Sequence, residues 1–143
     1  MKKEELMLGD WVFNTHNRKP EQVQEIGSGL VMLDNNDLYE YDEIEPIPLT
    51  AEILEANGFR AHTEANYIMY VWAVEGRRNE TIIAISIYKK PVNGVRILTK
   101  IQTDCRYDCG INEIHCCEIE YVHELQHALR LCGIDKEIII KED

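Results

Sequence analysis

Apolar and polar positions alternate along most of the chain, and short turn-forming segments interrupt the alternation. In residues 8–49 the apolar positions form roughly five short runs, separated by turn segments such as 27–29. Short strands at this spacing are typical of a small SH3-like barrel. We therefore expect residues 1–49 to form an SH3-like β-barrel segment. Pro46 and Pro48 should lie in an edge or exit strand, because proline cannot donate to a central ladder.

A short helix is indicated immediately after this segment, at residues 50–59. Thr50 can accept a hydrogen bond from the first helical turn, and Gly58 suits the left-handed residue that follows a helix. We expect this helix to connect the barrel with the rest of the chain.

From residue 67 to residue 121 the apolar runs become longer, and the third of them alternates cleanly between apolar and polar positions. They lie at 67–74, 81–88, 95–103 and 113–121. This pattern predicts a four-stranded antiparallel meander, and one face of such a sheet needs cover. The helix expected at 122–132 is the long element available to provide it. We expect an α+β protein in which residues 60–143 form this sheet and its helix. The whole chain could also form one compact unit.

The helix expected at 122–132 has one apolar and one polar side. At about 100° per residue, the apolar stripe consists of Val122, Leu125, Ala128, Leu129 and Cys132. The other side carries His123, Gln126, His127 and Arg130. We expect the leucines to be buried on the sheet and the polar side to face water. The tail at 136–141 can add one more strand.

The net charge of the chain disfavours some classes of binding partner. The chain carries 26 acidic residues against 15 Lys and Arg, a formal net charge of −11. This balance opposes nonspecific binding to nucleic acids or anionic membranes, which requires clustered basic residues. The apolar runs are too short to span a bilayer, and the first residues lack the apolar core of a secretion signal. We expect a cytoplasmic protein whose five cysteines stay reduced.

Residues 123–127 have the H-E-x-x-H spacing of zinc peptidases. His123 and His127 lie four residues apart on one helix face and can share a Zn²⁺, with Glu124 as general base. A catalytic zinc needs three protein ligands. The extended form of the motif fails, because Arg130 occupies its glycine position. We therefore favour a structural helix and keep a small zinc-dependent hydrolase as the alternative.

A second group of potential ligands is formed by Cys105, Cys109, His115, Cys116 and Cys117. These residues could hold a structural zinc, or supply the third ligand of the hydrolase alternative. Against this, adjacent cysteines point to opposite faces of a strand, and the segment contains no Cys-x-x-Cys pair. Free cysteine is also a common core residue. We expect no metal and no cofactor, and leave the cluster open.

Three segments resemble a group of small uncharacterised proteins from Bacteroides-type gut bacteria, often of phage-like origin. They read LGDWV, IEPIPLTAEILEANGF and YVHELQHALRLCG. The resemblance covers about 6–59 and 119–138 and does not extend to the strands at 67–117. In that group the helix typically reads YVHELQN, which implies that His127 is optional. The group has no known activity, cofactor or catalytic residues to assign to this chain.

The sequence contains no complete catalytic constellation, so we assign no catalytic or cofactor-binding residues. We expect a non-enzymatic protein that binds another macromolecule, with a protein as its partner and a prophage or mobile element as its origin. Trp11 and Trp72 are expected to pack inside the fold. Tyr39 and Tyr41 are expected to be exposed, where they could form a peptide-binding surface of the kind that SH3-like barrels often use.

Overall fold

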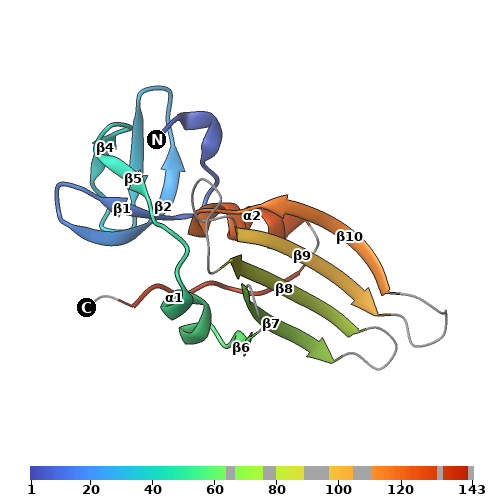
Figure 1. Cartoon of the computed structure of the whole chain (residues 1–143). Helices are drawn as coiled ribbons and strands as arrows, with labels where there is room; N and C mark the ends of the chain where they lie inside the picture. The colour runs from blue at the N-terminus through green and yellow to red at the C-terminus, as the bar shows by residue number, and fades with distance from the viewer. Residues whose placement is uncertain (64–66, 76–79, 89–96, 105–110, 132–133, 142–143) are drawn as a thin grey trace. The chain divides into compact units, whose positions relative to one another are not determined.

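The protein is α+β, with two antiparallel sheets of five strands each (Figure 1). The computed structural model describes residues 1–63, 67–75, 80–88, 97–104, 111–131 and 134–141. Contacts divide the chain into two compact units. The first unit combines Met1–Leu49 with Tyr121–Asp143, and the second is Thr50–Glu120. The predicted division instead placed residues 60–143 together, so the structure differs in the grouping of the last segment.

The first unit contains five short strands, as expected for residues 8–49. They are β1 (Trp11–Asn14), β2 (Lys19–Ile26), β3 (Leu30–Leu33), β4 (Leu38–Glu40) and β5 (Ile44–Pro46), preceded by the 3-10 turn η1 (Lys3–Glu5). Their order in the sheet is β4-β3-β2-β1-β5, so β5 is an edge strand, as its prolines predicted. Within residues 1–49, β4 and β5 do not pair with each other, and the sheet is not a closed barrel.

Strand β2 is long enough to pair with two different neighbours. Its first half pairs with β1, from Asn14↔Lys19 to Trp11↔Gln22. Its second half pairs with β3, and the register shifts by one residue just after Val23. A bulge of this kind bends a strand and increases its twist. The bend allows one sheet to curl around a small core.

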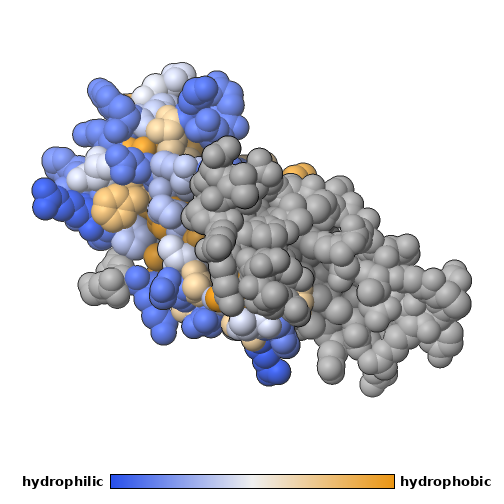
Figure 2. Space-filling model, in the orientation of Figure 1, coloured by the Kyte–Doolittle hydropathy of each residue, from blue (hydrophilic) through white to orange (hydrophobic). Residues whose placement is uncertain are grey.

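That core is apolar and comes from alternate strand positions. It consists of Leu6, Val12, Val23, Val31, Leu33, Tyr39 and Ile44. In β3 the alternation is direct, because Val31 and Leu33 are buried whereas Leu30 is exposed. The strands of the first unit thus bury one face in this core, and in β3 and β4 the residues of the other face are exposed or half-buried. Most of the described surface visible in Figure 2 is hydrophilic, in keeping with the net charge of −11.

The expectation of an exposed Tyr39–Tyr41 pair was wrong. Tyr39 is 6% exposed, and its hydroxyl accepts hydrogen bonds from Asn17 Nδ2 (2.9 Å) and Asn35 Nδ2 (2.6 Å). Tyr41 is half-buried and donates through its hydroxyl to the Gly27 carbonyl at 2.7 Å. Both rings therefore pack with their hydroxyl groups bonded, the usual arrangement for buried tyrosine.

The second unit is an antiparallel meander in the order β10-β9-β8-β7-β6. Its strands are β6 (Arg60–Thr63), β7 (Tyr67–Glu75), β8 (Glu80–Tyr88), β9 (Ile97–Asp104) and β10 (Ile111–Glu118). The four expected strands are confirmed, and β6 adds a fifth that pairs with β7. The described residues of the tail, 134–141, form no strand, contrary to expectation.

The short helix α1 (Ala51–Ala56) begins and ends as predicted. The Thr50 side chain accepts from the backbone N–H of Ile53 at 3.4 Å. At the other end Gly58 has φ +83°, and the Phe59 N–H donates to the Leu54 carbonyl at 3.0 Å. These are the features of a Schellman end, in which glycine takes the left-handed position at little steric cost.

The first residues of helix α2 (Val122–Leu131) bond to the residues that follow β5. The Val122 N–H donates to the Ile47 carbonyl at 2.9 Å, and Tyr121 forms an isolated bridge with Pro48. Leu125 and Leu129 are buried, at 0% and 1% exposure. The prediction placed them on the sheet at 67–121, whereas the structure groups α2 with the first unit. No helix among the described residues is long and apolar enough to cross a membrane.

The β3–β4 hairpin allows a direct test of which strand residues are buried in the core and which are exposed. Leu33 is fully buried and Leu38 is 61% exposed. We expect Leu33→Ala to lower the free energy of unfolding by about 2–5 kcal/mol, because it leaves a cavity in the core. Leu38→Ala should change it by no more than about 0.5 kcal/mol. Urea unfolding followed by circular dichroism measures both, and equal losses would contradict the described register.

Candidate functional site

The polar side of α2 converges on Asp10, which lies directly before β1 and is completely buried. Arg130 Nη1 donates to Asp10 Oδ1 at 2.9 Å, and the Met7 N–H donates to Oδ2 at 2.7 Å. His127 Nε2 lies 2.6 Å from the same Oδ2 atom. A buried carboxylate is costly unless it is paired and hydrogen-bonded. These three groups meet that requirement, and two of them come from α2.

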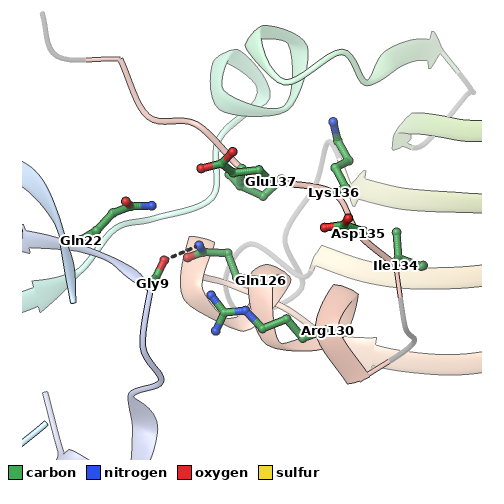
Figure 3. Close-up of a pocket in the computed structure, with 9 residues that line it drawn as sticks. Gly9, Gln22, Gln126, Arg130, Ile134, Asp135, Lys136 and Glu137 are labelled. Atoms are coloured by element: carbon green, nitrogen blue, oxygen red, sulfur yellow. Dashed lines mark hydrogen bonds between the residues drawn. The ribbon is translucent and has the colours of Figure 1, made fainter. Parts of the chain in front are cut away.

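Gln126 binds the backbone on both sides of Asp10. Its Nε2 donates to the Gly9 carbonyl at 2.9 Å (Figure 3). Its Oε1 accepts from the Trp11 N–H at 2.9 Å. The side chain is 6% exposed, so both bonds are protected from water. One amide side chain therefore satisfies a donor and an acceptor of the segment that leads into β1.

Gly9 forms the turn before β1, next to the Arg130 side chain of α2. Its φ is +79°, in the left-handed region that L residues rarely adopt. A Cβ atom at this position would lie 3.4 Å from Arg130 Nη2. The Gly9 N–H also donates to the Val23 carbonyl at 2.7 Å, which ties the turn to β2. The left-handed turn, more than the space beside the guanidinium, therefore requires glycine at this position.

The expectation that this side of α2 faces water was wrong. His123 is 5% exposed, and Gln126 is also buried. His127 and Arg130 bond to Asp10, as described above. His123 and Gln126 are buried and His127 is half-buried, whereas Arg130 stays partly exposed while its guanidinium bonds to Asp10. A helical wheel cannot show this, since it gives the residues that share a side but not what that side meets.

Glu124, the candidate general base, holds the start of α2. Its Oε2 accepts from the backbone N–H of Tyr121 at 3.1 Å. Glutamate at the third position of a helix commonly bonds back to the residue that precedes the helix, as one half of a capping box. Its position is therefore explained by helix geometry, independently of any metal.

The two candidate zinc ligands, His123 and His127, do lie together. Their ring centroids are 5.6 Å apart and nearly perpendicular, and the His123 ring stacks on Tyr121 at 5.9 Å. His123 Nδ1 is buried without a hydrogen-bond partner. Within the part of the chain that the structure describes, no group of three or more His, Cys, Asp or Glu side chains could hold a metal ion. The motif thus supplies two ligands, and the described residues supply no third.

Burial lowers the pKa of His123 below its ordinary value of 6.5, and the neighbouring His127 acts in the same direction. Asp10, Glu124 and Glu5 act in the opposite direction and are outweighed by the loss of hydration. The folded state therefore favours a neutral His123 ring. A neutral ring suits its stacked position on Tyr121.

The cysteine cluster falls mostly outside the described residues. Cys105 and Cys109 lie outside them. The backbone of the other three candidates is part of β10, where His115, Cys116 and Cys117 pair with Ile101, Lys100 and Thr99. Their side chains lie outside the description, so a metal at this cluster stays a prediction.

The burial of a second carboxylate, that of Glu21, was also not predicted from the sequence. It is 1% exposed and accepts from Asn14 Nδ2 at 2.6 Å, while Lys19 Nζ lies 3.1 Å from its other oxygen. Asn14 is itself fully buried. No motif marks such residues. The one available signal is that an acid or amide occupies an inward-facing position of an alternating strand.

A pocket of about 390 Å³ adjoins the Asp10 cluster (Figure 3). It is lined by Gly9, Gln22, Gln126, Arg130 and the five residues Ile134–Ile138. Arg130 and Lys136 contribute positive groups, and Asp135 and Glu137 contribute negative groups. Burial lowers the pKa of Lys136. The balanced charges indicate no particular ligand, so we assign none.

No protein-family model matches the chain, and comparison with curated proteins and with solved structures likewise gives no match. The site is therefore interpreted from its geometry alone.

The Asp10 cluster should contribute strongly to stability. We expect Asp10→Ala to lower the free energy of unfolding by about 1–3 kcal/mol, because it removes the bonds to Arg130, His127 and the Met7 N–H. Asp37→Ala is the matched control, since Asp37 is exposed, and should cost no more than about 0.5 kcal/mol. Equal effects in urea unfolding would show that the cluster contributes nothing.

The lowered pKa of His123 predicts a specific dependence of stability on pH. Below about pH 6.5 the unfolded chain binds a proton at this ring, whereas the folded protein resists doing so. The free energy of unfolding should therefore fall as the pH is lowered from about 7.5 to about 5.5. His123→Phe keeps an aromatic ring next to Tyr121 but cannot titrate, so its loss over that range should be smaller. An identical pH profile in both proteins would contradict the burial of His123.

Proposed function

We propose that the protein is a non-enzymatic binding protein whose partner is another protein. The observation that supports this most is the structural use of the H-E-x-x-H side chains. Glu124 bonds the residue before α2, and His127 bonds Asp10. The one sequence motif with a known chemistry is thus explained by the attachment of a helix.

The strand order of the first unit supports a relation to SH3-like barrels. In the order β4-β3-β2-β1-β5, the fifth strand returns to pair with the first. Pairing of β4 with β5 would close such a sheet into a barrel. Small barrels of this kind often use their outer surface to bind segments of other proteins. This support is a fold analogy, and fold alone does not determine function.

The charge of the chain favours a protein partner over a nucleic acid. A net charge of −11 repels phosphate backbones and anionic lipid headgroups. We propose that the protein acts in the cytoplasm and derives from a prophage or mobile element, in line with the resemblance of its three sequence segments. A hydrolase that uses His123, His127 and Glu124 is the alternative, favoured by the proximity of the two rings and the unpartnered His123 Nδ1.

The Glu124→Gln variant separates the two functions. Glutamine can replace glutamate in a capping box, so the start of α2 should be preserved, but it cannot act as a general base. We expect wild type and Glu124→Gln to capture the same stoichiometric partner from a lysate of the host bacterium. Neither should hydrolyse peptide or ester substrates with added zinc.

Turnover that requires zinc in the wild-type protein and is lost in Glu124→Gln would overturn the proposal. Metal analysis of His127→Asn supplies a second readout, because loss of a stoichiometric zinc from that variant would identify a metal site. Thermal melts of each variant show whether a loss of function reflects unfolding.

A further inference from the structure

The outward-facing residues of strands β2, β3 and β4 form one continuous surface. In the register of these strands Glu25 pairs with Met32 and Met32 pairs with Leu38, while Leu30 pairs with Glu40. Directly paired residues of an antiparallel ladder lie on the same face of the sheet. We call this set of five residues the outer hairpin face. The opposite face of the same strands carries core residues such as Val31 and Leu33.

The centre of the outer hairpin face is apolar and accessible. Leu30 is 41% exposed and Leu38 is 61% exposed, with Met32 half-buried between them. The two glutamates at its margins are exposed. An apolar centre with a polar rim is the usual composition of a protein interface. β4 is also an edge strand of the sheet, and exposed apolar edges are normally protected or used for binding.

The charges around this face have one sign. Residues 22–49 contain seven acidic residues and no Lys, Arg or His. Exposed acids stand in the turns at both ends of β4, with Asp34 and Asp37 before the strand and Asp42 after it. The face is therefore surrounded by negative charge that no basic residue within this stretch neutralises. A complementary surface must be basic as well as partly apolar.

We infer that the outer hairpin face binds a segment of a partner protein that is rich in lysine or arginine and carries apolar side chains between the charges. The inference rests on the proposed function and names the chemistry of its partner. Leucine-like side chains of the partner cover Leu30, Met32 and Leu38, and its basic groups lie against Glu25 and Glu40. The aliphatic stems of lysine and arginine add to the apolar contact.

A binding experiment with the full chain tests this inference. The probe is a short fluorescein-labelled peptide of alternating lysine and leucine, with a lysine–serine peptide and a glutamate–leucine peptide as controls. We expect the lysine–leucine peptide to bind best. In NMR spectra of the protein, the backbone amide signals that this peptide shifts should concentrate on Leu30–Leu33 and Leu38–Glu40. Binding should weaken between about 50 and 300 mM NaCl, because salt screens exposed charges.

Two matched pairs of variants locate the site. Leu8 and Leu38 have the same exposure, 61%. Leu38→Ser should weaken binding about fivefold or more, and Leu8→Ser should not change it. Glu40→Gln should weaken binding and reduce its salt dependence, whereas Glu4→Gln, at another exposed acid, should do neither. Equal effects within each pair, or equal binding of the lysine–serine peptide, would overturn the inference.

The same variants separate this inference from the proposed function. If Leu38→Ser captures the host partner as well as wild type does, the binding function stands and the outer hairpin face is not its site. If no partner is captured and zinc-dependent turnover appears, the proposed function itself fails. Thermal melts confirm that each variant is folded.

Discussion

The carboxylate of Asp10 is completely removed from water, and the arrangement of the first unit depends on how that carboxylate is satisfied. Its partners His127 and Arg130 are 117 and 120 residues away along the chain. A buried carboxylate without donors is unfavourable by several kcal/mol, so the folded state requires α2 beside the start of β1. The bond from Trp11 Nε1 to the Ile138 carbonyl, at 2.6 Å, extends the same attachment to the tail.

This attachment explains the spacing that resembles a peptidase motif. A helix that binds a strand segment through polar side chains must present them on one side, at intervals of three or four residues. His123, Gln126, His127 and Arg130 have these intervals. Of the two histidines four residues apart, His127 bonds Asp10 and His123 stacks on Tyr121, and the glutamate between them caps the helix.

The local features of the fold could be predicted from sequence because they depend on near neighbours. Thr50 and Gly58 mark the ends of α1, and the alternation in β3 separates Leu30 from Val31 and Leu33. The Asp10 cluster could not be predicted, because Asp10 reads as a turn residue and its partners lie at the other end of the chain. Tyr39 was misjudged for a related reason. Its hydroxyl is satisfied by amide side chains of two separate turns, and no periodic pattern reveals such a contact.

The first unit is discontinuous, and this has a consequence for the order of events on the ribosome. Its five strands are synthesised before residues Thr50–Glu120, and its helix only after them. During that interval the Asp10 carboxylate lacks the two side chains that bond to it in the folded state, whereas the whole sequence of the meander has already been synthesised. At about 5–20 residues per second, translation separates these stages by several seconds, which is long compared with the collapse of a small sheet. Vectorial synthesis therefore favours folding of the inserted unit before the surrounding unit is complete.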